Sequence, residues 1–404
     1  MEQSSISNTA RKTLLSRFLL ALVLLLGLRS PAIKAAHASG PPLYQPALAL
    51  LPIPSMDDWQ EVTVAFSHGA EGEWDHYMWG GFANSLIKRG NTYYLYYQGA
   101  TSYDEPCGDV TYRAIGLATS TDGIHWTKSP NNPVITFASP GRMMEGATSS
   151  AAWVGADGRI YIYYGANSAI SSTCYVRANA RLAVSEDGEH FQDLGQVLSS
   201  SNPNVWGAGD EIFPVGAYSH NGKWMMFYIP NGVSVAAKLG VAIGDRYDTF
   251  TQTVGVNNSS IPAWGPVSVI LNGTNSVLFT NPNGVSGPIN IYRFKANNPS
   301  SVSLYDSYQL PNCRQASVLY ESSIGRWLMA CRDSAAEQYI IRQANLSGTP
   351  IVTPTYTPLP ITTATRIATG TRTVTPIYTP SPTTAAPKAT ATRTPTRKPS
   401  TTAP

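Results

Sequence analysis

Residues 92–100 read TYYLYYQGA, and they follow the polar turn Arg89-Gly90-Asn91. A short run of aromatic and β-branched residues bounded by turn residues is typical of a β-strand. The same order of turn and strand returns four more times along the chain. The further copies are residues 159–167 (RIYIYYGAN), 223–232 (KWMMFYIPNG), 276–281 (SVLFTN) and 326–333 (RWLMACRD). The pattern indicates a chain built from a repeated β unit.

A second element follows the first in at least three of the units. It reads IGLATSTDGIHWTK at residues 115–128 and RLAVSEDGEHFQD at residues 181–193, with a looser copy, KLGVAIGDRYDTFTQ, at 238–252. In the first two copies the Asp of a Ser-x-Asp-Gly turn can bond to the backbone, and the Gly tolerates a positive φ. We predict that the aromatic residues after these turns, Trp126 and Phe191, pack between neighbouring sheets.

The units recur about every 50–65 residues, a period typical of propellers. A small sheet cannot bury both of its faces alone, but a ring of such sheets buries them against each other. We predict an all-β fold, a five-bladed β-propeller, in which residues 57–66 supply the strand that closes the ring with the last blade. A six-bladed ring and an irregular β-sandwich are the alternatives.

The N-terminal region has the order of a secretory signal peptide. Arg11, Lys12 and Arg17 precede the apolar run FLLALVLLLGL at residues 18–28, and Ala36-His37-Ala38 offers a small-x-small cleavage pattern. A membrane-spanning helix needs about 20 apolar residues, so we favour a cleaved signal over a permanent anchor. We expect a secreted protein, located in the extracellular space or at the cell surface, with no membrane span after cleavage.

The C-terminal region, residues 349–404, is rich in Thr and Pro and contains no Asp or Glu. This composition buries too little apolar surface to fold, so we predict a disordered tail or stalk. The domain organisation that we expect is a signal peptide at 1–38, a linker at 39–56, a propeller at 57–348 and the tail at 349–404.

The formal charge of the whole chain is +3, but the excess of Lys and Arg lies in the two ends. The body between them carries more acidic than basic residues, which argues against a nucleic-acid partner. An acidic body suits a neutral or cationic ligand.

The four cysteines are Cys107, Cys174, Cys313 and Cys331. An even number in an exported chain favours disulfides, and four cysteines allow three pairings. We prefer Cys313–Cys331, which flank one hairpin, and Cys107–Cys174, which occupy matching loops of adjacent units. A metal site is not predicted, because the chain has no C-x-x-C and no His at ligand spacing.

Two phrases carry a resemblance to a known group of enzymes. SLIKRGNTYYLYYQG at residues 85–99 and GLATSTDGIHWTKSPNNPVI at residues 116–135 resemble the five-bladed propeller glycosidases of glycoside hydrolase families 43 and 32, which include arabinanases, xylosidases and invertase-like enzymes. The resemblance covers most of residues 74–342 and rests on blade scaffold. It implies an active site at one end of the central channel, where carboxylates from the first three blades protonate the leaving oxygen and activate water or attack.

The resemblance also implies which carboxylates act. Glu211, in GDEIFP of the third blade, is the expected general acid, and Glu145, in MMEGATSS of the second blade, or Asp210 is the expected modulator of its pKa. Ala83 and Asn84 stand where the family has its acid in the first blade. The nearest upstream acid is Asp75, which we expect to act as the base or to orient water.

Other residues of the same segments are candidates for substrate binding. Aromatic faces pack against sugar rings, although packing between blades is the alternative for the tryptophans, and local pairing is the alternative for Asp109 and Arg113. The full set is Trp74, His76, Trp79, Trp206, Asp109, Arg113, Arg332 and Asp333. No organic cofactor is implied, and no ligand loop marks the structural Ca²⁺ or Na⁺ ion that a channel of this kind could hold.

The function expected from the sequence is hydrolysis of glycosidic bonds in plant or microbial glycans by a secreted, monomeric protein, with an oligosaccharide or polysaccharide as substrate. The missing acid of the first blade favours an alternative, a catalytically inactive propeller that binds glycan or a surface partner. A structural module displayed on the Thr/Pro-rich stalk is a third alternative.

Overall fold

A computed structural model describes residues 51–78, 84–104, 109–137, 146–169, 176–209, 211–230, 237–272, 275–283 and 287–345. Within these ranges the chain forms twenty β-strands and one 3₁₀ turn, η1 (Met56–Asp58). None of these segments contains a helix long and apolar enough to cross a membrane.

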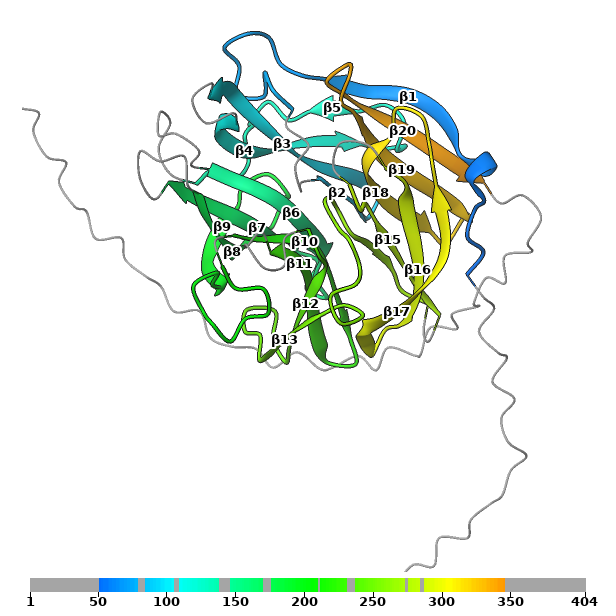
Figure 1. The fold of residues 1–404 in the computed structure, drawn as a ribbon. Helices are drawn as coiled ribbons and strands as arrows, with labels where there is room; N and C mark the ends of the chain where they lie inside the picture. The colour runs from blue at the N-terminus through cyan, green and yellow to red at the C-terminus, as the bar shows by residue number, and fades with distance from the viewer. Residues whose placement is uncertain are drawn as a thin grey trace, which may run out of the picture. The chain divides into compact units, whose positions relative to one another are not determined.

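The strands form five antiparallel blades of four strands each, arranged around a central axis (Figure 1). The first blade contains β2 (Asn84–Arg89), β3 (Thr92–Asp104), β4 (Asp109–Ser120) and β5 (Thr127–Lys128), and the second contains β6 (Gly146–Val154), β7 (Ile160–Ala169), β8 (Val176–Ser185) and β9 (Gln192–Leu198). The third contains β10 (Ile212–His220), β11 (Lys223–Pro230), β12 (Gly240–Gly244) and β13 (Gln252–Gly255), and the fourth contains β14 (Ser268–Ile270), β15 (Ser276–Thr280), β16 (Ile289–Lys295) and β17 (Asn298–Tyr308). The fifth contains β18 (Arg314–Glu321), β19 (Arg326–Asp333), β20 (Gln338–Asn345) and β1 (Gln60–Ser67). The predicted five-bladed propeller is confirmed.

The ring closes through the two ends of the body. Strand β1 pairs antiparallel with β20, from Gln60 opposite Gln343 to Ser67 opposite Gln338, as predicted. The segment before β1 also packs against the ring, because Leu51 is buried in the core between the fourth and fifth blades. The packed body therefore includes residues on the N-terminal side of residue 57.

One apolar cluster fills each of the five interfaces between blades. In β3, Tyr94 and Tyr96 face the second blade, while Leu95 and Tyr97 face the fifth. A strand buried on both faces needs a continuous apolar run, which explains TYYLYYQGA. Trp126 packs against the cluster between the fifth and first blades and Phe191 against the one between the first and second, as predicted.

The repeated Ser-x-Asp-Gly turns share three backbone-to-side-chain hydrogen bonds. In the first, Asp122 Oδ1 accepts from the backbone N–H groups of Ile124 and His125, each at 2.8 Å, and the N–H of Gly123 donates to Ser120 Oγ. Hydrogen bonds from the side chain and backbone of His125 hold the pKa of Asp122 well below its usual range.

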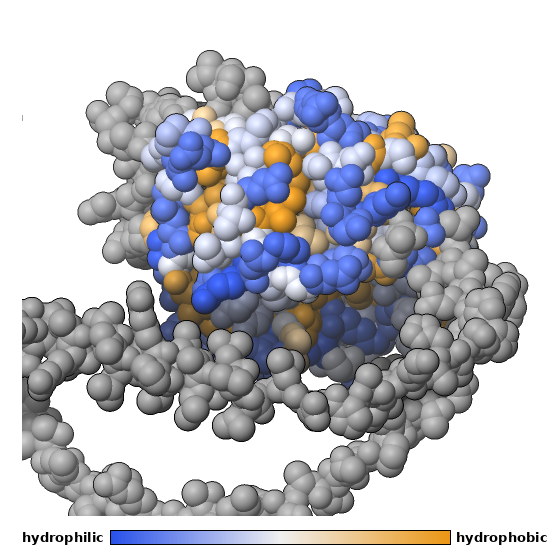
Figure 2. Space-filling view, turned by 90° about the horizontal axis from the view of Figure 1, so that it is seen from below, coloured by the Kyte–Doolittle hydropathy of each residue, from blue (hydrophilic) through white to orange (hydrophobic). Residues whose placement is uncertain are grey.

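In a space-filling view of one face, hydrophilic residues cover most of the surface and hydrophobic ones show between them (Figure 2).

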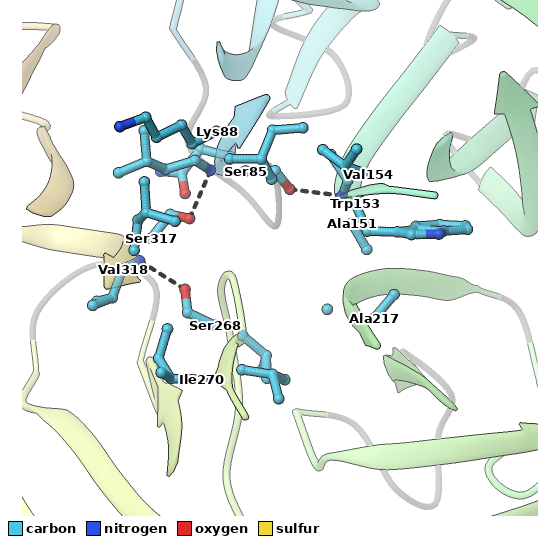
Figure 3. A pocket seen from close by; sticks show the side chains of 18 residues that line it. Ser85, Lys88, Ala151, Trp153, Val154, Ala217, Ser268, Ile270, Ser317 and Val318 are labelled. Carbon is cyan, nitrogen blue, oxygen red and sulfur yellow. Dashed lines mark hydrogen bonds between the residues drawn. The ribbon is translucent and has the colours of Figure 1, made fainter. Parts of the chain in front are cut away.

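Serine hydroxyls join the innermost strands of neighbouring blades (Figure 3). Ser268 Oγ accepts from the N–H of Val318 (2.7 Å), Ser317 Oγ accepts from the N–H of Leu86 (2.9 Å), and Ser85 Oγ accepts from the N–H of Ala152 (3.1 Å). These bonds link the fourth blade to the fifth, the fifth to the first, and the first to the second.

The third and fourth blades meet without such a serine. The N–H of Val267 donates directly to the carbonyl of Val215 at 2.8 Å. A Cβ at Gly216 would lie 2.4 Å from the carbonyl oxygen of Val267, so only glycine allows the two backbones to approach this closely.

A disulfide joins Cys313, just before β18, to Cys331 in β19, which confirms one predicted pairing. Cys107 and Cys174 lie outside the described residues, so their pairing stays a prediction.

Ser317→Ala leaves the buried N–H of Leu86 without its acceptor and should lower the free energy of unfolding by about 1–3 kcal/mol. Urea unfolding followed by tryptophan fluorescence measures the change. Ser303→Ala is the matched control, because Ser303 is exposed on the outermost strand β17 and its hydroxyl makes only a 3.4 Å bond. Equal effects of the two substitutions would contradict a role for the serine bonds in ring closure.

Candidate functional site

The innermost strands β2, β6, β10, β14 and β18 line a central channel with a cavity of about 280 Å³. Their first residues lie together at one end of this channel, which we call the mouth. Asn84 at the start of β2 contacts Gln315 at the start of β18, and the would-be Cβ of Gly265, just before β14, lies close to Asn281 and Gln315.

A layer of neutral polar side chains is buried at the mouth. Burying such groups is unfavourable unless hydrogen bonds compensate. The exposed fractions are 1% for Asn84, Gln98 and Thr148, 0% for Asn167, and 3% for Asn281 and Gln315. Some of these groups are satisfied within the fold: Thr148 Oγ1 donates to Gln98 Oε1 at 2.5 Å, and the N–H of Ala316 donates to Asn281 Oδ1 at 2.9 Å.

Asn84 presents an amide in the first blade, where the resemblance implies an acid at the place of Ala83 and Asn84. Its Nδ2 donates to the carbonyl of Gln315 at 2.6 Å, and its Oδ1 has no partner among the described residues. Burial raises the pKa of Tyr339 to about 12, against the opposing effects of the nearby Arg332 guanidinium and the Asn84 amide. Asn84, Tyr339 and Arg332 therefore form one buried group at the mouth.

Arg332 and Asp333 have different roles at the end of β19. Arg332 is 7% exposed, its Nη2 donates to Glu337 Oε1 at 2.9 Å, and its Nε has no partner within the described ranges. Asp333 Oδ1 accepts from the N–H groups of Ala335 and Ala336 and so stabilises the turn before β20. Both residues were predicted to bind substrate, and of these two only Arg332 belongs to the group at the mouth.

An unbroken row of paired backbones crosses the mouth from the first blade to the third. Each residue of the row pairs with the next: Tyr77, Ala100, Arg113, Gly146, Asn167, Ala178 and Glu211. Neighbouring strands lie about 4.8 Å apart, so the backbones of Asn167 and Glu211 are roughly 10 Å apart. The row fixes Arg113, Asn167 and Glu211 relative to each other, although they come from three different blades.

Gly146 makes the junction between the first and second blades. Its φ is +150° and its pairing with Arg113 is parallel. A Cβ at this position would lie 2.0 Å from the carbonyl oxygen of Arg113. Only glycine fits there. The glycine of GATSS at the start of β6 is therefore required by the junction with Arg113 and not by the strand itself.

Asn167 was not among the residues predicted from the sequence. It is the last residue of the sequence run RIYIYYGAN and lies within β7, and neither polar atom of its amide has a partner in the described part of the chain. An amide stands within or directly after the second strand in three blades, as Gln98 in β3, Asn167 in β7 and Asn281 after β15. That repetition was the available signal, because a polar residue has no reason to recur in otherwise apolar strands unless it serves the mouth.

Asp75 lies in a second pocket, of about 310 Å³, together with Glu73, Trp74 and Lys128. Its Oδ2 accepts from Lys128 Nζ at 2.7 Å and from the hydroxyl of Tyr97 at 3.0 Å. This pocket shares no lining residue with the central channel, so the structure does not bring Asp75 to Glu211 there. A catalytic role for Asp75 stays a prediction, and its contacts are those of a buried ion pair.

Trp74 and Trp206 each pack against two glycines, Trp74 on the second and third strands of the first blade and Trp206 on the third and fourth strands of the third blade. Would-be Cβ atoms on Gly99 and Gly116 lie 2.6 and 2.5 Å from the indole of Trp74, and those on Gly240 and Gly255 lie 2.7 Å from the indole of Trp206. Each indole therefore packs where glycines leave room on a sheet. Nearby, the ring of His76 lies against those of His68 and Tyr77, with centroids 5.7 and 4.6 Å away.

The remaining candidates are only partly described. Arg113 is 6% exposed and Glu211 is half-buried. Trp79, Glu145, Asp210 and the side chain of Asp109 lie outside the described residues. Within the described ranges, no three His, Cys, Asp or Glu side chains gather in a way that could hold a metal ion.

No protein-family model matches this sequence, and no curated protein matches it. Solved structures do resemble the fold. A structure from Parabacteroides distasonis assigned to the glycoside hydrolases is 14% identical, with a TM-score of 0.50 over 72% of this chain and 99% of that one. A member of family 130, in which mannoside phosphorylases occur beside hydrolases of β-1,2-mannosidic linkages, is 13% identical, with a TM-score of 0.50 over 72% of this chain and 94% of that one.

The family 32 β-fructofuranosidase of Bombyx mori is 12% identical, with a TM-score of 0.51 over 73% of this chain and 65% of that one. These proteins are five-bladed propellers, so the expected likeness to the fold of that group of glycosidases is confirmed. At these identities the likeness establishes the fold alone.

Gly146→Ala should lower the free energy of unfolding by about 3 kcal/mol or more, because overpacking against Arg113 adds to backbone strain. Gly222→Ala is the control, since Gly222 has a positive φ of 74° and nothing within 4 Å of its would-be Cβ, and it should cost about 1 kcal/mol. Thermal and urea unfolding measure both. A Gly146 variant as stable as the Gly222 variant would rule out the close junction.

Proposed function

We propose that this chain is a secreted glycoside hydrolase that binds glycan at the mouth and cleaves glycosidic bonds with Glu211 as general acid. The observation that supports the proposal best is the row of paired backbones that holds Glu211 in register with Asn167 and Arg113. The row joins an ionisable oxygen to neutral and cationic hydrogen-bonding groups at one end of the channel.

The buried amides suit the hydroxyl groups of a neutral sugar. A buried polar atom without a partner costs about 1–3 kcal/mol, and a ligand hydroxyl would supply the missing bond. Asn84 Oδ1 can accept such a bond, Gln98 Nε2 can donate one, and Asn167 can do both. A substrate bound there would satisfy groups that the described part of the fold leaves unsatisfied.

Hydrolysis needs a second carboxylate besides the acid. Glu145 and Asp210 directly precede Gly146 and Glu211 in the sequence, so they are the candidates for the base and for the group that tunes the pKa of Glu211. A separation of about 5 Å from Glu211 would favour retention of configuration, and one of about 6.5–9.5 Å would favour inversion. The chemistry requires no organic cofactor.

One observation favours a second function, the recognition of glycan without hydrolysis. The first blade offers the amide of Asn84 at the mouth, and Asp75 is bound to Lys128 in a separate pocket. A mouth with one acid can still bind sugar hydroxyls, but it lacks the pair that hydrolysis needs.

The secreted protein should be screened on aryl glycosides and on arabinan, xylan and fructan. Glu211→Gln removes the proton donor while keeping the shape of the side chain, so kcat on an active substrate should fall by about 100-fold or more. Glu186→Gln serves as the control, because Glu186 is an exposed carboxylate in the turn after β8 and should leave kcat unchanged.

Activity that survives Glu211→Gln would remove the assignment of the acid. Binding of a glycan by calorimetry, with no turnover of any substrate by the unsubstituted protein, would favour the recognition function instead.

A further inference from the structure

The second pocket, which we call the rim pocket, is lined by Glu73, Trp74, Asp75 and Lys128 together with Ser129, Pro130 and Asn132. It lies between the loop that precedes the first blade and β5, the outermost strand of that blade. It shares no lining residue with the central channel. The rim pocket and the mouth are therefore separate places on the molecule.

The indole of Trp74 is packed against the first blade and forms part of the lining of the rim pocket. Trp74 packs where Gly99 and Gly116 leave room within β3 and β4, and its ring centroid lies 5.6 Å from that of Tyr97. Glycine inside a strand weakens it, so two of them beneath one indole indicate that the position of Trp74 matters more than local strand stability. The indole is only partly buried, which leaves part of it to line the pocket.

Charged groups adjoin the indole. The side chain of Asp75 is 3% exposed and that of Lys128 is 29% exposed, and the Lys128 Nζ also lies 5.6 Å from the ring centroid of Phe66. Both hydrogen bonds to the Asp75 carboxylate, from Lys128 and Tyr97, go to Oδ2. A buried ion pair is stable only when further hydrogen bonds satisfy its remaining atoms.

The second oxygen of Asp75 faces another carboxylate. Asp75 Oδ1 and Glu73 Oε2 lie 2.3 and 2.4 Å from the position that a Cβ of residue 69 would take, so only glycine at this position makes room for both oxygens. Glu73 Oε2 also accepts from the N–H of Ala70 at 2.9 Å. Among the described residues, no side chain donates a hydrogen bond to Asp75 Oδ1. The pocket thus combines acceptor oxygens, an ammonium donor and part of an indole.

We propose that the rim pocket is a second saccharide-binding site, for a neutral pyranose with vicinal hydroxyl groups. One hydroxyl can donate to a carboxylate while its neighbour accepts from the Lys128 ammonium, and both bonds are charge-assisted. The C–H face of the sugar then covers the indole. Two carboxylates against one ammonium make the pocket negative, which disfavours sugars that carry a carboxylate.

The chain contains a matched control for the indole. Trp206 also packs where two glycines leave room, here Gly240 and Gly255 on the third and fourth strands of its blade, with its centroid 6.3 Å from that of Tyr228. Gly207 follows it where Asp75 follows Trp74. Trp206 is therefore an indole packed on glycines whose next residue in the sequence carries no carboxylate.

The test is a titration of the ¹⁵N-labelled full chain with methyl β-glucopyranoside, methyl α-mannopyranoside and methyl β-galactopyranoside, followed by the indole N–H resonances. Trp74→Phe identifies the resonance of Trp74, which should shift with at least one glycoside, whereas methyl glucuronide should shift it less. Glu73→Gln, a change to an exposed side chain, should weaken that binding about fivefold or more, and Trp206→Phe should leave it within about twofold.

Asn167→Ala separates this site from the mouth. It should impair any turnover and leave the shift of the Trp74 resonance intact, because Asn167 belongs to the mouth and is not among the residues that line the rim pocket. An unmoved Trp74 resonance with all three glycosides, or a shift that disappears in the Asn167 variant, would overturn the proposal. If no substrate is hydrolysed but the Trp74 resonance still shifts, the proposed hydrolase function is refuted and the proposed binding site in the rim pocket is not.

Discussion

Three serine hydroxyls on the innermost strands hold neighbouring blades together around the axis. An innermost strand has no further strand on its channel side, so its backbone N–H groups need other acceptors. Ser268, Ser317 and Ser85 supply them from the blade before. A small hydroxyl side chain bridges the gap while leaving the channel open. The mouth depends on this constraint, because its residues come from separate blades and meet only if the ring has one fixed diameter.

The mouth and the rim pocket differ in the charge of the side chains that form them. The described side chains of the mouth are mostly amides, with Glu211 as a half-buried acid held at the start of β10. Neutral amides bind neutral groups at little desolvation cost, and amide atoms that lack a hydrogen bond can form one with a ligand hydroxyl group. In the rim pocket, the buried carboxyl of Asp75 accepts hydrogen bonds from Lys128 and Tyr97. The two pockets therefore present different chemistry to ligands.

At several of these places close packing depends on the missing Cβ of a glycine. Gly146 allows β6 to lie against the backbone of Arg113, and Gly216 allows the third and fourth blades to meet through their backbones. Gly99 and Gly116 make room for Trp74. In each case the missing Cβ is replaced by an atom from another part of the chain, which explains why glycine recurs in strands that it would otherwise weaken.

Local patterns were sufficient to predict the blade and its repetition. Runs such as TYYLYYQGA read as strands buried on both faces, the Ser-x-Asp-Gly turns formed the expected hydrogen bonds, and Cys313 and Cys331 paired across one hairpin. Strand β1 closed the ring where an unpaired strand at the N-terminal end of the repeats required a partner.

The sequence by itself thus determined the architecture, because strand burial, turns and hairpins depend on residues that are neighbours along the chain. The tertiary structure alone decided that Asp75 pairs with Lys128 and that Arg113, Asn167 and Glu211 share one row. The ion pair joins side chains that are 53 residues apart, and the row passes from blade to blade through the single bridges Arg113–Gly146 and Ala178–Glu211. Contacts of this kind between distant segments leave no periodic pattern in the sequence.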